Sequence, residues 1–285
     1  MQTLTQIRTM LEERGIRPKH RLGQNFLHDH NQLRRIVEAA ELQPGDLVLE
    51  VGPGTGVLTG ELLDESVEVV ACELDRDMAA IVVERFGDRL RLHRGDCLDR
   101  HRHLTPELLE ILGDREFHLV ANLPYQSATP LIMDLLLRRP RCRGQVVLIQ
   151  KEVADRLASP PGDRTYGVIS VVASVFGRVR RIGDVPPGCF WPPPKVTSSI
   201  VRIGTRDPDF EGDRETFADF VAELFRTRRK QIGAILGRMD LRIPDEIDPT
   251  RRPESFSPEE FVELFRRLGD RFAAGRRPRH DPHQE

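Results

Sequence analysis

The chain has 285 residues, with 43 Lys or Arg against 45 Asp or Glu, so its formal net charge is −2. This balance argues against a nucleic-acid-binding protein, because such domains are usually basic. The length allows one or two domains with a core that needs no disulfide or metal. The four cysteines form no Cys-x-x-Cys pair, which favours reduced thiols in a cytoplasmic protein and predicts no metal site. No apolar run approaches the roughly 18 residues of a membrane-spanning helix, so we expect no membrane segment.

Extended and helical patterns alternate through the first two thirds of the chain. Short apolar runs predict buried strands, and apolar residues at helical spacing predict the helices between them. The predicted strands are, in order, 47–51, 67–73, 90–94, 117–121, 145–150, 179–182 and 196–203. The predicted helices are 30–42, 57–63, 76–86, 104–112 and 130–137, while 169–176 fits either a helix or a strand. Repeated βαβ units predict an α/β fold, with a parallel sheet covered by helices on both faces.

The character of the sequence changes after Ile203. Only helical patterns follow, over 217–225, 229–236 and 261–268. We therefore predict an α/β domain over residues 1–205 and a small all-helical domain over 206–275. The polar stretch 276–285 is predicted to be a disordered tail.

A glycine-rich turn at residues 52–56 joins the first buried strand to a helix. A dinucleotide fingerprint would need a further glycine where Val57 stands, so a nicotinamide-dependent oxidoreductase is disfavoured. Pro53 also lacks the backbone N–H that a pyrophosphate would use. S-adenosylmethionine carries no phosphate and needs a close backbone approach, which Gly52 and Gly54 allow. The turn therefore favours this cofactor, and the alternative is a structural turn without a ligand.

Two carboxylates stand at the ends of the next two predicted strands. Glu73 follows Gly52 by 21 residues, where a carboxylate can accept hydrogen bonds from both ribose hydroxyls of a nucleoside. Asp96 ends the third strand and is placed to meet the adenine edge. A surface ionic role is the alternative for each residue, but their position at successive strand ends favours a shared ligand.

The segment Asn122-Leu123-Pro124-Tyr125 follows the fourth predicted strand and resembles the catalytic element of methyltransferases that act on ring-conjugated amines. Such an amine is a weak nucleophile, because its lone pair is delocalised into the ring. The side-chain oxygen of Asn122 and the carbonyl of Leu123 can accept its N–H groups and return electron density to the nitrogen. Pro124 fixes the turn, and Tyr125 offers a face on which an extruded base can stack. The alternative is a Pro-Tyr turn that only caps the strand.

The whole pattern resembles the small-subunit ribosomal RNA dimethyladenosine transferases. Nine motifs keep the family order over about residues 17–270, and all four lysines of the chain fall inside them. The motifs lie at residues 19–27, 50–54, 73–75, 122–125, 150–153, 166–167, 185–187, 190–196 and 225–230. Gln126 is a departure, because the family usually has Asn or His after the catalytic Tyr.

The resemblance implies a Rossmann-like, seven-stranded class I methyltransferase sheet with a small C-terminal helical domain. It implies an enzyme that uses S-adenosylmethionine to dimethylate two adjacent adenines in the terminal hairpin loop of small-subunit ribosomal RNA. The implied partner is the immature small subunit, and we expect a monomer. By motif match, the implied cofactor contacts are Asn25, Leu27, Gly52, Gly54, Glu73, Asp96 and Asn122. Phe190 would stack on the target base opposite Tyr125, unless it is only a packing residue.

RNA contacts are expected from local basic segments that the net charge conceals. Residues 38–77 hold eleven acidic residues and one Arg, whereas residues 226–242 hold six basic residues and one Asp. The expected RNA-binding residues are Lys195, Arg226, Arg228, Arg229 and Lys230, although each Arg run could instead be a solvated surface.

Two other functions remain open at this stage. One is a large-subunit ribosomal RNA adenine methyltransferase of the macrolide-resistance type. The other is a non-catalytic ribosome-assembly or transcription factor on the same fold, which the intact Asn-Leu-Pro-Tyr element and Glu73 disfavour.

Overall fold

Seven strands form a mixed sheet in the order β4-β3-β2-β5-β6-β9-β7 in the computed structural model, which describes residues 2–206 and 210–275. The tail predicted at 276–285 lies outside the described residues. Neighbouring strands from β4 to β6 run parallel, whereas β9 is antiparallel to both β6 and β7. The strands are β2 (Leu47–Val51), β3 (Glu68–Glu73), β4 (Leu90–Arg94), β5 (Phe117–Asn122), β6 (Cys142–Gln150), β7 (Gly177–Val185) and β9 (Ser198–Thr205). The expectation of a parallel sheet is wrong at β9, because this strand follows β7 without the crossover helix that a parallel pair requires.

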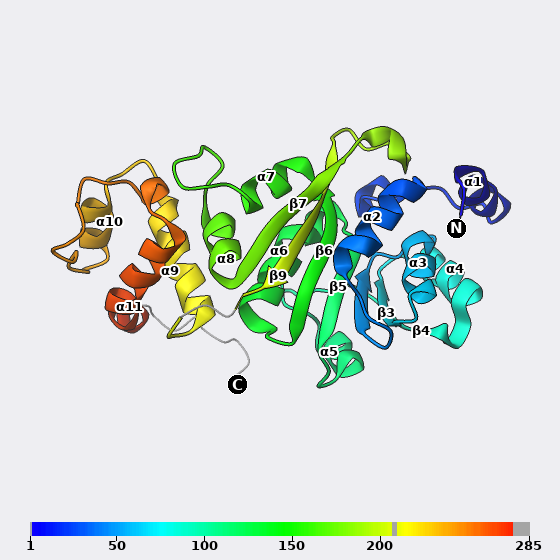
Figure 1. Ribbon diagram of the computed structural model, residues 1–285, viewed down its shortest axis with the longest axis horizontal. Coiled ribbons are helices and arrows are strands. Elements are labelled where there is room, and N and C mark those ends of the chain that lie inside the picture. The colour runs from blue at the N-terminus through cyan, green and yellow to red at the C-terminus, as the bar shows by residue number, and fades with distance from the viewer. Residues whose placement is uncertain (1, 207–209, 276–285) are drawn as a thin grey trace.

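Helices cover both faces of the sheet (Figure 1), as the alternating βαβ pattern predicted. Alternate residues of the buried strands enter different cores, so that Val48 packs with the helices of one face and Leu49 with those of the other. The first face carries α1 (Leu4–Glu13), α2 (His30–Ala40), α3 (Val57–Asp64) and α4 (Arg76–Phe86). The second carries α5 (Pro106–Leu112), α6 (Tyr125–Arg138), α7 (Lys151–Leu157) and α8 (Val168–Phe176).

Two helices differ from the predicted ones. Helix α6 begins at Tyr125 and contains Pro130, so the predicted start of this helix at Pro130 is wrong by five residues. Helix α1 is not among the predicted helices. A capping box between Thr3 and Gln6 starts it, and two of its apolar residues, Ile7 and Leu11, are fully buried.

The C-terminal part is helical, and its elements gather at the end of the molecule opposite α1 (Figure 1). They are α9 (Arg214–Arg226), α10 (Ile232–Arg238) and α11 (Pro258–Gly275), and the described residues after Thr205 include no strand. Phe217 of α9 packs edge-on against Phe176 of α8 and against Phe265 of α11. One hydrophobic core therefore runs from the sheet into these helices, and a domain division at residue 205 stays a prediction.

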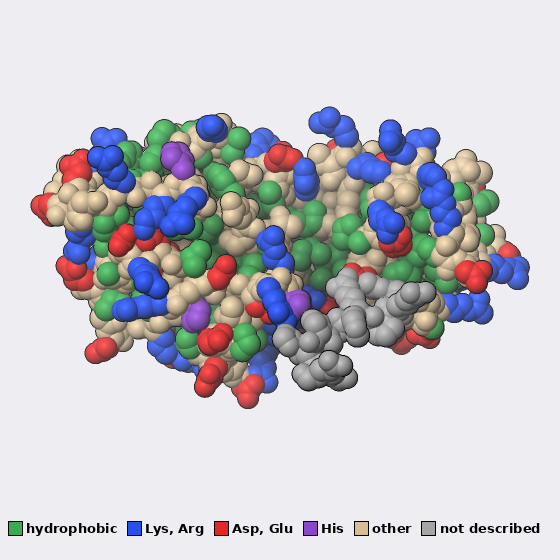
Figure 2. Space-filling model, turned by 180° about the vertical axis from the view of Figure 1, so that it is seen from behind, with side chains coloured by type: hydrophobic (Ala, Val, Ile, Leu, Met, Phe, Trp, Pro, Cys, Tyr) green, Lys and Arg blue, Asp and Glu red, His purple; other side chains and the backbone are tan. Residues whose placement is uncertain are grey.

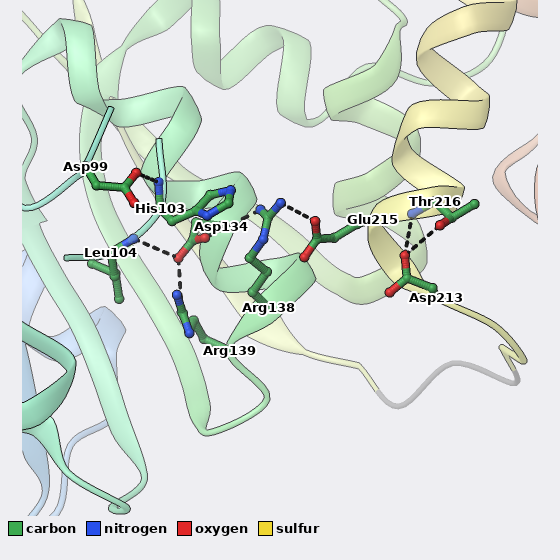
Figure 3. Close-up of polar contacts among 9 residues, drawn as sticks. All are labelled: Asp99, His103, Leu104, Asp134, Arg138, Arg139, Asp213, Glu215 and Thr216. Carbon is green, nitrogen blue, oxygen red and sulfur yellow. Dashed lines mark hydrogen bonds and ion pairs between the residues drawn. The ribbon is translucent and has the colours of Figure 1, made fainter. Parts of the chain in front are cut away.

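A polar contact also joins the two parts (Figure 3). Arg138 of α6 forms an ion pair with Glu215 of α9 and lies 3.5 Å from the buried carboxylate of Asp134. Within the described ranges, no helix is both long and apolar enough to cross a membrane.

Candidate active site

A cavity of about 400 Å³ opens at the carboxyl ends of β2, β3 and β5. Ligands of α/β proteins commonly bind at this edge of the sheet. The residues predicted to bind the cofactor or the target base all line this cavity: Asn25, Leu27, Gly52, Gly54, Glu73, Asp96, Asn122, Leu123, Pro124, Tyr125 and Phe190. The structure therefore brings together segments that are up to 165 residues apart in the chain.

The backbone geometry of the turn after β2 requires glycine at two positions. Gly52 and Gly54 have φ angles of 74° and 58°, in the left-handed region that favours glycine. A Cβ atom at Gly54 would lie 3.0 Å from the ring of Phe26. The absence of side chains at these positions therefore keeps the floor of the cavity open and lets other groups approach the backbone.

Glu73 is buried at the end of β3 and is fixed by two backbone groups. Its Oε1 accepts a hydrogen bond from the Asp75 N–H at 2.8 Å, and its Oε2 accepts one from the Gly54 N–H at 3.1 Å. Burial raises the pKa of Glu73, and these hydrogen bonds oppose that rise only in part. Each carboxylate oxygen keeps a further lone pair for a ligand.

Asp75, which orients Glu73, is itself held by the N-terminal segment. Its carboxylate accepts hydrogen bonds from Lys19 Nζ at 2.7 Å and from Gln24 Nε2 at 2.6 Å. Burial opposes ionisation of Asp75, but these bonds outweigh it and lower the pKa of the carboxyl. Sequence reasoning placed Lys19 and Gln24 in a family motif without a role, because nothing in the sequence shows that they meet Asp75.

A short two-stranded ribbon closes one side of the cavity. Strand β1 (Phe26–Leu27) pairs antiparallel with β8 (Phe190–Trp191), so that Leu27 lies opposite Phe190. The rings of Phe26 and Trp191 stack with centroids 6.4 Å apart. Phe190 is only 4% exposed. Sequence reasoning did not predict this ribbon, because its two strands are two residues long and far apart in the chain.

Asn122 ends β5 with its amide group in a defined orientation. Its Nδ2 donates a hydrogen bond to the backbone carbonyl of Asn25 at 3.1 Å. Among the described residues, nothing donates a hydrogen bond to Asn122 Oδ1 or to the Leu123 carbonyl. Pro124 precedes α6, and Tyr125 is the first residue of that helix. Two free oxygen acceptors and an aromatic side chain therefore meet at one side of the cavity.

Asp96 and Glu50 are two of the other carboxyl groups that line the cavity. Asp96 is exposed, and its Oδ1 accepts a hydrogen bond from the Leu98 N–H. Glu50 in β2 is 1% exposed and accepts a hydrogen bond from the Thr59 hydroxyl at 2.7 Å. Burial raises the pKa of Glu50 to about 8, so this carboxyl is largely protonated at neutral pH. The sequence shows Glu50 only as a residue near the end of a predicted strand and as the first residue of a motif, and it gives no sign of this protonation state.

The five residues expected to bind RNA lie outside this cavity and have different surroundings. Arg228 is held by Glu254 at 2.7 Å and by the backbone carbonyl of Arg164. Arg226 pairs with Glu223 on its own helix. The remaining three, Lys195, Arg229 and Lys230, are exposed, and their side chains have no hydrogen-bond or ion-pair partner within the described residues.

Many other arginines of the described chain are paired with acidic residues. Arg141 and Arg143, for example, pair with Asp114 and Glu116. On the face shown in Figure 2, basic and acidic side chains are interspersed and do not form one basic face. The net charge near zero thus reflects many local ion pairs as well as the separate acidic and basic segments seen in the sequence.

The sheet has a single antiparallel strand, which lies second from one edge, and its cavity is lined by a glycine turn and a carboxylate at a strand end. Together these two features define a class I methyltransferase. The profile of the family described as "Ribosomal RNA adenine dimethylase" matches residues 15–269. The chain belongs to this family, as the motif resemblance indicated, and it is an enzyme of the methyltransferase class.

Individual relatives agree with this assignment. The chain is 39% identical to "Ribosomal RNA small subunit methyltransferase A" of Mycolicibacterium paratuberculosis, over 94% of this chain and 88% of the relative. It is 40% identical to the protein of the same name from Corynebacterium diphtheriae, over 92% and 93% of the two chains. Among solved structures, a dimethyladenosine transferase from Plasmodium falciparum has the same fold, with a TM-score of 0.73, 24% identity and coverage of 87% and 98%. The 23S rRNA methyltransferase ErmE matches with a TM-score of 0.61, 26% identity and coverage of 86% and 99%.

Proposed function

We propose that this protein transfers methyl groups from S-adenosylmethionine to the exocyclic amines of two adjacent adenines in the terminal hairpin loop of small-subunit ribosomal RNA. The observation that carries the proposal is that Asn122 and Leu123, whose oxygen acceptors have no donor among the described residues, line the same cavity as Glu73. A site for a nucleoside cofactor and a site for a ring amine are therefore adjacent. The names of the relatives that are 39–40% identical support the small subunit as the source of the RNA.

The cavity residues fit the cofactor. The free lone pairs of Glu73 would accept the ribose hydroxyls, and the open backbone at Gly52 and Gly54 would admit the amino-acid portion. Asp96 would meet the adenine edge, while Asn25 and Leu27 would border the ligand from the N-terminal segment. When bound, the cofactor supplies an activated methyl group.

The protein contributes positioning and hydrogen-bond acceptors to the reaction. Asn122 Oδ1 and the Leu123 carbonyl would accept the two N–H groups of the adenine amine, which favours a pyramidal nitrogen with a localised lone pair. The hydrogen bond from Asn122 Nδ2 to the Asn25 carbonyl supports this role, because it orients the amide without any substrate. The amine proton becomes acidic once the nitrogen carries the methyl group, so no strong base is needed in the cavity.

The target base would be held between aromatic side chains. Tyr125 and Phe190 line the same cavity from α6 and from the β1–β8 ribbon. Stacking on such faces compensates for removing the base from its neighbours in the RNA. Pro124 precedes the helix and directs the Leu123 carbonyl toward the base.

Lys195, Arg226, Arg229 and Lys230 are proposed to contact RNA phosphates. Arg228 is better explained as a structural residue, because its guanidinium is already bound to Glu254 and to a backbone carbonyl. The proposed partner is the immature small subunit, bound by a monomer in the cytoplasm.

The test is methyl transfer from labelled cofactor to undermethylated ribosomal subunits, with the modified bases identified by mass spectrometry. We expect dimethyladenosine at two adjacent positions of small-subunit RNA. The fold shared with ErmE keeps a large-subunit substrate as the second candidate, and label found only in large-subunit RNA would establish it instead. No label in either RNA would favour a non-catalytic assembly factor.

A further inference from the structure

A second cavity, of about 320 Å³, lies at the edge of the sheet opposite the candidate active site. It is bordered by the first residues of β6 and the last residues of β9, which end near each other because these strands are antiparallel. Four arginines line it: Arg139, Arg143, Arg206 and Arg214. No Asp or Glu does so among the residues that the structure describes. We propose that this cavity binds a phosphate group.

Contacts within the protein orient Arg139 and Arg214 but leave several N–H donors of each guanidinium without a partner among the described residues. Arg139 donates through Nε to the buried carboxylate of Asp134 at 3.1 Å (Figure 3), and its terminal nitrogens have no partner in the described part of the chain. Arg214 donates to the Leu136 carbonyl, and its guanidinium lies 4.8 Å from the ring centroid of Phe176. A guanidinium has five N–H donors, so each keeps several for an anion.

Arg206 and Arg143 are likewise each held through one nitrogen. One nitrogen of Arg206 donates to the Ser174 carbonyl at 2.7 Å, and one nitrogen of Arg143 pairs with Glu116. Both side chains are exposed and line the cavity. Fixed guanidinium groups that converge without a lining carboxylate favour a bidentate oxyanion such as phosphate over a neutral ligand.

Gln145 provides a second, independent indication of a polar ligand. Its side chain is 3% exposed and lines the cavity, yet its Oε1 has no hydrogen-bond partner among the described residues. Buried polar groups without a partner are rare in folded proteins and call for an explanation. The amide can accept from a phosphate hydroxyl, or turn and donate to a phosphate oxygen.

The four arginines come from two parts of the chain. Arg139 and Arg143 flank the start of β6, whereas Arg206 follows β9 and Arg214 opens α9. A phosphate bound by all four would bridge the sheet and the C-terminal helices. This group could belong to an RNA backbone or be free phosphate, and both present the same oxygens to the site.

The test is titration of the full-length protein, in phosphate-free buffer, with inorganic phosphate and separately with decauridylate, which lacks adenine and therefore avoids the proposed target base. We expect saturable binding of at least one probe, weakened about tenfold or more by the double variant Arg143→Gln/Arg206→Gln. Gln145→Leu should also weaken binding while keeping the volume of the side chain.

The matched control is Arg141→Gln/Arg242→Gln, which removes the same charge from exposed positions outside the cavity. Arg141 comes two residues before Arg143, just ahead of β6, and their side chains are 48% and 50% exposed. Binding of phosphate alone identifies a free anion as the ligand, and much tighter binding of decauridylate identifies an RNA backbone. The proposal is overturned if neither probe saturates, or if both double variants lose affinity equally. Because methyl transfer is not the readout, this outcome would leave the proposed function untouched.

Discussion

Lys19 Nζ lies 2.7 Å from Oδ1 of Asp75, although 56 positions separate the two residues in the chain. Asp75 in turn presents its backbone N–H to Glu73. The N-terminal segment therefore reaches the proposed ribose carboxylate through one intermediate residue, and the cavity is complete only when this segment is docked.

Replacing Lys19 with Met should weaken cofactor binding with a smaller effect on kcat. Asp75 would lose one charge-assisted hydrogen bond, and we expect about a tenfold rise in the Kd of S-adenosylhomocysteine, measured by calorimetry. Lys19→Arg should restore part of the affinity, because it returns the charge with a different geometry. Lys151→Met is the control, since Lys151 pairs with Asp155 away from the cavity. An equal loss in both variants would contradict a specific role for Lys19.

Replacing Asn122 with Ala should abolish methyl transfer and largely spare cofactor binding. Loss of one preorganised acceptor at the reacting amine should lower kcat by roughly 100-fold or more. Single-turnover transfer to undermethylated small subunits, combined with calorimetry of S-adenosylhomocysteine, separates the two effects. Wild-type transfer by the variant would refute the acceptor role.

Glu50 should make the stability of the protein fall as pH rises. The unfolded carboxyl ionises near its ordinary pKa of 4.5, whereas the folded one stays protonated up to about pH 8. Between these values the folded state binds more protons than the unfolded state, so its stability declines with increasing pH, by at most about 1.4 kcal/mol per pH unit.

Glu50→Gln tests this expectation, because the variant keeps an acceptor for the Thr59 hydroxyl but cannot ionise. The free energy of unfolding of the variant minus that of the wild type, both measured with urea, should increase as pH rises from 4.5 to 8. A difference between the two proteins that does not change with pH would show that Glu50 is already ionised in the folded state.

Replacing Phe190 with Leu should impair reaction with RNA while preserving the fold. Leucine can fill the buried position opposite Leu27, but it offers no ring for stacking. Base stacking contributes about 1–3 kcal/mol, so kcat/KM for RNA should fall roughly 5- to 150-fold. The Kd of the cofactor product and the Tm should change little. Full kcat/KM in Phe190→Leu would show that the ring is needed only for packing.

Arg228 and Arg229 are adjacent but should respond differently to replacement by Gln. Arg228→Gln loses its contacts with Glu254 and Arg164, and we expect a destabilisation of about 1 kcal/mol. Arg229→Gln should leave stability unchanged and reduce the salt dependence of RNA binding by about one unit of slope. Urea unfolding and binding titrations at several salt concentrations distinguish them, and the reverse pattern would contradict both assignments.

The sequence by itself was sufficient for the order of the seven sheet strands along the chain and for most of the cavity. Apolar runs and glycine turns are local signals, and the carboxyl ends of parallel strands must share one edge of the sheet. Gly52, Glu73 and Asn122 are therefore predicted to share one site from the sequence alone. The direction of β9 could not, because strand direction depends on the length and path of the connection.

Only the tertiary structure decided which residues support the site and which charges are free. The contacts of Lys19 with Asp75 and of Leu27 with Phe190 join segments far apart in the chain, and no local pattern encodes such pairings. The pKa of Glu50 depends on burial, which is a property of the packed core. Likewise, a run of arginines has one composition whether its members face solvent, as Arg229 does, or an acidic partner, as Arg228 does. Composition sums charges over the chain, whereas binding depends on where each charge lies in space.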